Sequence, residues 1–137
     1  MCGICGIIRF DNQAVDHSKI KTMMLKQKHR GPNDEGIFSH NSTALGFVRL
    51  SILDLSLAGH QPMHDASGRY TMVFNGEIFN YIELRDDLKS KGISFTSNSD
   101  SEVLLKMYIY FGEDCLNYLN GMFAFAFHNK DRNQLMI

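Results

Sequence analysis

The segment 122–127, which reads Met-Phe-Ala-Phe-Ala-Phe, constrains the fold more than any other part of this chain. It alternates large and small apolar side chains and contains no polar residue, a pattern typical of a strand buried on both faces of its sheet. Phe123, Phe125 and Phe127 are therefore expected in the core, and we assign them no other role.

Shorter apolar runs, separated by polar turns, predict further strands. The expected strands cover residues 4–10, 36–38, 44–50, 52–55, 70–74, 122–127 and 134–137, with the fifth stopping at Asn75-Gly76. Because strands and helices mix without a regular βαβ alternation, the predicted class is α+β.

Three helices are expected between these strands. The first begins at its cap, Asp16, and runs to about His29 before Gly31-Pro32 ends it. The other two each begin with a capping-box pattern and end at a glycine. These are Asn80 with Glu83 and Gly92, and Ser99 with Glu102 and Gly112, and a short helical turn is expected over 114–119.

The size and charge of the chain narrow the functions it can have. Its 137 residues are typical of one domain, and its hydrophobic share of 44% is ordinary for a folded protein. The formal net charge of −1 gives no electrostatic reason to expect binding to nucleic acid or to an anionic membrane. No apolar run approaches the roughly 20 residues of a spanning helix, and the start does not resemble a signal peptide, so we expect a cytoplasmic protein.

The three cysteines are Cys2, Cys5 and Cys115, an odd count that argues against a disulfide framework. Cys2 and Cys5 form a C-x-x-C pair, but a redox motif needs its first cysteine at a helix N-terminus. Here the pair leads into an expected strand, where residues three apart point to opposite faces. A zinc site would need two further ligands, and the sequence offers none at a suitable spacing. Cys5 and Cys115 are expected to be small buried hydrophobes.

Cys2 differs from the other two cysteines by its position. Removal of Met1 would leave a thiol and a free α-amine on one residue. An α-amine has an unperturbed pKa of about 7.7–8.0, so it can accept the thiol proton at cellular pH and activate the nucleophile. A second-position cysteine can also be accidental, and the position alone favours that interpretation.

Seven short motifs follow one another along the chain. They are Cys-Gly-Ile at 2–4, His-Arg-Gly-Pro at 29–32, Arg-Leu-Ser-Ile at 49–52, Gln-Pro-Met at 61–63, Asn-Gly-Glu-Ile-Phe-Asn at 75–80, Ser-Asp-Ser-Glu-Val at 99–103 and Gly-Met-Phe-Ala-Phe at 121–125. In this order they resemble the N-terminal glutaminase domain of glutamine-dependent asparagine synthetases, which are class II amidotransferases. The resemblance covers essentially the whole chain. The sequence differs from the family pattern at Asn33, where the family usually has aspartate.

The resemblance implies a fold and a nucleophile. The fold would be the four-layer αββα sandwich of the N-terminal nucleophile (Ntn) hydrolases, with Cys2 at the end of a central strand. Cys2 would attack the side-chain amide of L-glutamine and form a γ-glutamyl thioester. The side-chain amide of Asn75 and the backbone N–H of Gly76 would stabilise the oxyanion. From the residues alone, Asn-Gly predicts a hairpin turn instead.

The resemblance also implies how the amino-acid end of glutamine is held. Arg49 would pair with the α-carboxylate, Asp100 would receive the α-ammonium group, and Glu77 is a second candidate for that group. Ile52 and Leu53 would contribute backbone contacts. Taken alone, the residues favour other interpretations: Arg49 as a solvated surface charge, and Asp100 as a helix N-terminal acid favoured by the dipole.

The resemblance finally implies which groups lie outside the chain. No metal and no cofactor are expected in this domain, which spans residues 1–137 and is expected to be truncated before its last strands. ATP and Mg would belong to a C-terminal synthetase domain, whose Ser-Gly-Gly-x-Asp-Ser loop is absent here. The expected partners are L-glutamine, that synthetase domain and a second copy of the chain in a homodimer. Two alternatives stay open: an amidotransferase domain serving another acceptor, such as a sugar or antibiotic precursor, and a non-catalytic glutamine-binding domain.

Overall fold

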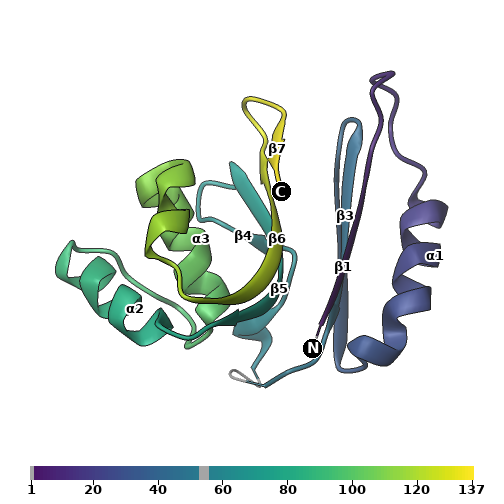
Figure 1. Cartoon of the computed structure of the whole chain (residues 1–137). Helices are drawn as coiled ribbons and strands as arrows, with labels where there is room; N and C mark the ends of the chain where they lie inside the picture. The colour runs from purple at the N-terminus through teal and green to yellow at the C-terminus, as the bar shows by residue number, and fades with distance from the viewer. Residues whose placement is uncertain (1, 53–55) are drawn as a thin grey trace.

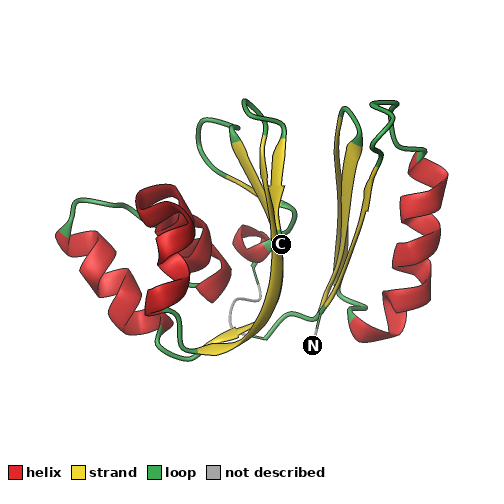
Figure 2. Ribbon diagram, turned by 45° about the horizontal axis from the view of Figure 1, so that its top comes forward, coloured by secondary structure: helices red, strands yellow, loops and turns green. Residues whose placement is uncertain are grey.

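Two antiparallel sheets lie face to face between layers of helix in the computed structural model of the chain, which describes residues 2–52 and 56–137 (Figure 1). Helix α1 (His17–Gln27) covers the outer face of the first sheet, and α2 (Tyr81–Ser90) and α3 (Asp100–Phe111) cover the outer face of the second. Figure 2 shows the same four layers from another side. The predicted α+β class and αββα sandwich are confirmed.

The first sheet contains β1 (Gly3–Ile8), β3 (Thr43–Arg49) and β2 (Asp34–His40), with β3 in the middle. Every residue of β3 is buried because the strand has α1 on one side and the second sheet on the other. The antiparallel register pairs Gly3 with Val48. Cys2 therefore lies beside the C-terminal end of β3.

Helix α1 begins where the sequence predicts. The side chain of Asp16 accepts a hydrogen bond of 2.8 Å from the backbone N–H of Ser18 and so caps the helix. Ile20 and Met24, four residues apart, are buried on the face that packs against the first sheet. The helix then tightens into a 3₁₀ turn, η1 (Lys28–Arg30).

The second sheet has the strand order β4 (Met63–His64), β5 (Tyr70–Ile78), β6 (Gly121–Asn129) and β7 (Gln134–Met136). A 3₁₀ turn, η2 (Leu57–Gly59), precedes β4, and another, η3 (Gly112–Tyr118), follows α3. In the part of the chain that the structure describes, no helix is long and apolar enough to cross a membrane.

Strand β5 is longer than the sequence predicts. It continues through Asn75 and Gly76 to Ile78, and Gly76 pairs with Phe123 of β6. The hairpin-turn interpretation of Asn-Gly is therefore wrong. Local turn propensity is overridden because nine residues of β5 pair in register with nine of β6.

Strand β6 is buried on both faces only along its second half. Phe125, Ala126 and Phe127 are buried, whereas Met122 is 69% exposed. Figures 1 and 2 show the first part of the strand curving away from the first sheet. The alternating pattern could not reveal where the facing sheet ends.

The two predicted capping boxes have different outcomes. Ser99 caps α3, since its hydroxyl oxygen accepts from the backbone N–H of Glu102 at 3.2 Å. Asn80 makes no such bond at the start of α2. Its amide donates to the carbonyl oxygen of Tyr118 and accepts from the backbone N–H of Asn120, so it ties together segments distant in sequence.

Phe127 should be a large contributor to stability. It is fully buried and stacks on Tyr108 of α3 with ring centroids 4.1 Å apart. We expect Phe127→Ala to lower the free energy of unfolding by about 3–5 kcal/mol. Urea denaturation followed by circular dichroism measures the change, with Phe10→Ala, at a side chain 92% exposed, as the matched control. Equal effects of the two substitutions would contradict the assigned core.

Candidate active site

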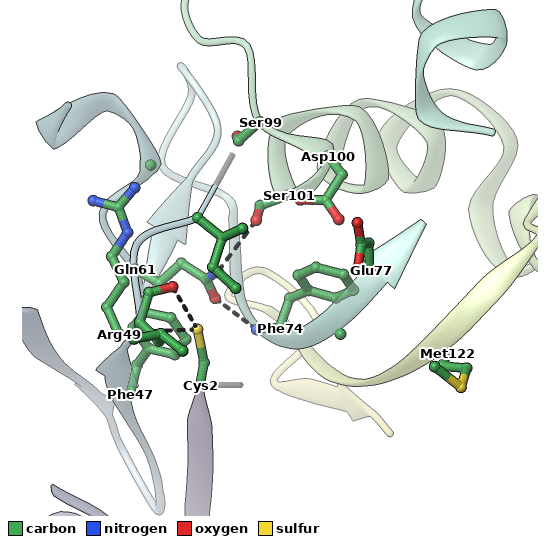
Figure 3. A pocket seen from close by; sticks show the side chains of 14 residues that line it. Cys2, Phe47, Arg49, Gln61, Phe74, Glu77, Ser99, Asp100, Ser101 and Met122 are labelled. Atoms are coloured by element: carbon green, nitrogen blue, oxygen red, sulfur yellow. Dashed lines mark hydrogen bonds between the residues drawn. The ribbon is translucent and has the colours of Figure 1, made fainter. Parts of the chain in front are cut away.

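A cavity of about 120 Å³ opens where β1 and β3 of the first sheet approach β5 and the start of α3 (Figure 3). The expected site residues that line it are Cys2, Arg49, Ile52, Gly76, Glu77 and Asp100. Asn75 does not line it, and Leu53 lies outside the described residues. Among the expected site residues, Cys2 and Asp100 are 98 positions apart in the sequence and still meet in this one cavity.

Cys2 is held by backbone and side-chain contacts at the end of β1. The backbone N–H of Leu50 donates to its Sγ at 3.3 Å, and the thiol lies 3.6 Å from the Leu50 carbonyl oxygen. Arg30 donates from Nε to the Cys2 carbonyl oxygen at 3.0 Å. These contacts fix the thiol so that it points into the cavity.

Gly76 and Asn75 face different sides of β5. Gly76 lines the cavity, and a Cβ on this residue would lie 2.4 Å from the Met122 carbonyl oxygen, so only glycine fits between the paired strands. Asn75 is two residues from Val73 and so points to the same face of β5. Val73 packs in the layer between the sheets, together with Cys2. The Asn75 Oδ1 is buried and has no hydrogen-bond partner among the described residues. Its amide is therefore not saturated by the protein.

Arg49 ends β3 with its side chain 7% exposed, so the interpretation as a solvated surface charge is wrong. Its Nη1 donates to the Ser56 carbonyl oxygen at 2.8 Å, which holds the guanidinium group at one side of the cavity. A planar guanidinium group with several donors suits a carboxylate ligand.

Asp100 is the first residue of α3 and is 5% exposed. Its Oδ2 accepts from the backbone N–H of Ile78 at 3.1 Å. Burial raises the pKa of Asp100 and the nearby Glu77 carboxylate raises it further, while hydrogen bonds from the Ile78 and Ser101 backbones oppose the rise. Asp100 is thus both the helix N-terminal acid and a wall of the cavity.

The charges around the cavity are separated. The guanidinium group of Arg49 lies on one side, and the carboxyl groups of Asp100 and Glu77 lie close together on the other (Figure 3). An amino acid carries a carboxylate and an ammonium group on one carbon, so its two charges match this arrangement. Ile52, which is 66% exposed, also lines the cavity.

Three residues without a predicted role, Arg30, Gln61 and Leu50, also lie at the site, and each belongs to a motif of the resemblance. Arg30 holds the Cys2 backbone, Leu50 contacts the thiol, and Gln61 lies in the cavity wall. Asn33, the departure from the family pattern, accepts a hydrogen bond from the Ser51 backbone through Oδ1 at 3.1 Å. An aspartate could accept the same bond, so the loop contact does not depend on the difference.

The other cysteines are outside this cavity. Cys5 packs in the apolar cluster under α1, on the face of β1 opposite to Cys2, as predicted for residues three apart in a strand. Cys115 is fully buried, which raises the pKa of its thiol to about 11. Within residues 2–52 and 56–137, no three His, Cys, Asp or Glu side chains are arranged to hold a metal ion.

A family model described as a glutamine amidotransferase domain matches residues 1–137. The chain belongs to this glutamine amidotransferase family. The amidotransferase domain is 41% identical to asparagine synthetase [glutamine-hydrolyzing] 1 of Bacillus subtilis over 98% of its length, covering 22% of that protein. It is 43% identical to putative asparagine synthetase [glutamine-hydrolyzing] 2 of Methanocaldococcus jannaschii over 96% of its length, covering 28% of that protein. The chain thus spans about a quarter of the length of these relatives.

A solved structure supports the fold of the amidotransferase domain. Glutamine phosphoribosylpyrophosphate amidotransferase from B. subtilis superposes on 95% of the chain with a TM-score of 0.75. The sequence identity is 20%, and the match covers 35% of that protein. At this identity the likeness establishes the shared fold and nothing about the substrate.

The buried carboxyl group of Asp100 should cost the domain stability at neutral pH. Because its folded-state pKa is raised, the folded protein retains this proton to higher pH than the unfolded chain, so stability falls as pH rises through that range. Asp100→Asn keeps an oxygen for the Ile78 N–H and loses the titration. We therefore expect the free energy of unfolding of Asp100→Asn, relative to wild type, to increase between about pH 3 and about pH 7.

Urea denaturation at both pH values measures this difference. Asp86→Asn, on the exposed face of α2, controls for the change in net charge. A relative stability of Asp100→Asn that falls as pH rises would contradict the assigned desolvation of Asp100.

Proposed function

We propose that this chain is the glutaminase domain of a glutamine-hydrolysing asparagine synthetase and that it converts L-glutamine to glutamate and ammonia through Cys2. The observation that carries the proposal is the cavity that contains the Cys2 thiol, the Arg49 guanidinium group and the Asp100 carboxyl group. A nucleophile between two opposite charges can hold the amino-acid end of glutamine while attacking its side-chain amide.

The proposed reaction begins when the α-amino group of Cys2, freed by removal of Met1, takes the thiol proton directly or through one water. The thiolate attacks the side-chain carbonyl carbon of glutamine, and the Gly76 backbone N–H and the Asn75 amide stabilise the oxyanion. The C–N bond then breaks. The nitrogen takes the proton back from the α-ammonium group and leaves as ammonia, and a γ-glutamyl thioester remains on Cys2.

Water completes the cycle. The α-amino group takes one proton from the water molecule as its oxygen attacks the thioester carbonyl carbon. Collapse of the tetrahedral intermediate breaks the C–S bond, which releases glutamate and returns the thiol with its proton. In both half-reactions Arg49 binds the α-carboxylate of the substrate, and Asp100, with Glu77 beside it, receives the α-ammonium group.

The proposed acceptor of the ammonia is aspartate, activated with ATP and Mg by a C-terminal synthetase domain in the full-length cytoplasmic protein. The names and lengths of the B. subtilis and M. jannaschii relatives support this assignment. Another acceptor remains the second candidate, because an amidase, chry2 of Gibberella zeae, is also 41% identical over 79% of the chain. Mass spectrometry of the products formed by the full-length protein from glutamine, ATP and aspartate separates the two.

Replacement of Cys2 tests the enzymatic function itself. We expect Cys2→Ala to lower glutaminase activity by at least about a thousandfold, because the acyl-enzyme cannot form without the thiol. A coupled glutamate assay measures it. Cys5→Ala is the matched control, since that thiol lies on the opposite face of β1 and should not affect turnover. Equal activity of Cys2→Ala and wild type would refute catalysis and favour a non-catalytic glutamine-binding domain.

Blocking the N-terminus tests the proposed base. A tag preceding Cys2 removes the free amine but leaves the thiol, so we expect a loss of at least about a hundredfold in kcat/KM. Proteolytic removal of the tag, verified by intact mass, should restore activity. Full activity with the tag in place would rule out the α-amine as the general base.

A further inference from the structure

Gln61 has a buried side chain that bridges two elements of the cavity wall. The residue lies between η2 and β4, and its side chain is 3% exposed. Its Oε1 accepts from the backbone N–H of Phe74 at 2.6 Å, and its Nε2 donates to the Ser101 hydroxyl oxygen at 3.3 Å (Figure 3). Both ends of the carboxamide are therefore used inside the protein.

The first bond completes the edge of β5 at a point that no strand reaches. Strand β4 pairs with β5 only through Met63 with Met72 and His64 with Thr71. Among the described residues, no further strand continues along that edge toward Asn75. The Phe74 N–H is buried, and the Gln61 side chain supplies the acceptor that a neighbouring strand would otherwise provide.

The second bond connects this edge to the first turn of α3. That turn already binds β5 through Asp100, which accepts from the Ile78 backbone. Ser101 adds a second attachment, through Gln61, at Phe74. The two attachments flank the segment 75–77, which contains the proposed oxyanion donors.

The backbone of Gln61 is packed against the first sheet. A Cβ on Gly36 of β2 would lie 2.2 Å from the Gln61 carbonyl oxygen, so the two backbones are in close contact. The preceding residue, His60, contacts Asp34 of β2 through a 2.6 Å interaction between Nδ1 and Oδ2. Gln61 therefore joins the sheet that carries Cys2 to the strand and helix that form the opposite wall.

We propose that Gln61 is a positioning residue for glutamine hydrolysis, acting through Phe74 and Ser101 to hold the segment 75–77 at the correct distance from Cys2. The inference rests on the proposed glutaminase function. The carboxamide is suited to the task because it has both an accepting oxygen and a donating NH₂ group and places no charge beside Asp100 and Glu77. Gln61 itself takes no part in bond formation.

Gln61→Met tests the proposal because methionine keeps the length of the side chain and removes both hydrogen bonds. We expect kcat to fall about 10–100-fold, as for a displacement of reacting groups by about 1 Å. KM should change less than about threefold, because Arg49 and the Asp100 contact with Ile78 are retained. Gln134→Met, the same substitution on the exposed part of β7, should leave both parameters unchanged.

Two further measurements separate positioning from a loss of folding. Alkylation of Cys2 by iodoacetamide needs only the thiol and should proceed at the wild-type rate in Gln61→Met, whereas labelling by a chloroketone analogue of glutamine should slow with kcat. Ser101→Ala removes only the second bond and should lower kcat less than Gln61→Met, again without a matching rise in KM. Ser101→Ala thus provides the test if Gln61→Met does not fold.

The outcomes distinguish this inference from the function on which it rests. Wild-type kcat in Gln61→Met and Ser101→Ala, in a protein whose activity requires Cys2, would overturn the role of Gln61 alone. Parallel losses in the iodoacetamide and chloroketone reactions would also overturn it. A wild-type protein without Cys2-dependent glutaminase activity would overturn both the inference and the proposed function.

Discussion

The antiparallel pairing of β1 with β3 is the constraint on which the site depends, because it holds a residue at the very start of the chain. Terminal residues fray unless other contacts tie them down. Here all six residues of β1 pair with β3, and the partner strand is buried on both faces. Arg30 and Leu50 then fix the carbonyl group and the thiol of Cys2. Backbone and side-chain contacts therefore hold Cys2 at the cavity, next to the paired strand.

The wall of the cavity opposite Cys2 contains a carboxyl group, that of Asp100, whose burial is electrostatically unfavourable. Asp100 is removed from water beside another carboxylate, Glu77, and hydrogen bonds from backbone N–H groups only partly offset the desolvation. A stable fold without a ligand would favour a neutral residue at this position. A cationic group entering the cavity would reverse the balance, since it would stabilise the charged form of Asp100. The arrangement is therefore more favourable with a cationic group in the cavity than without one.

Local signals in the sequence predict the fold better than they predict the contacts of the site. The Asp16 and Ser99 caps act within one helical turn, so their sequence patterns identify them. Asn80 has a similar pattern but bonds to a segment about 40 residues away, which no local pattern reveals. Asn75-Gly76 shows the same limitation, because strand pairing overrides the turn. Six of the residues that the resemblance names line one cavity, but Asn75 does not line it, and the resemblance gives no role to Gln61, whose contacts are three-dimensional.

The site is divided between two sheets that do not exchange strands. Its geometry therefore depends on the packing of the layer between them, where Leu45 and Phe47 meet Val73 and Ala126. Apolar packing is close but non-directional. It therefore fixes the distance between the sheets more firmly than it prevents one sheet from sliding over the other. Directional hydrogen bonds at the cavity resist the sliding that such a layer permits, and Gln61 supplies them. A sequence could keep every catalytic motif and still lose the chemistry if that link or that layer were repacked.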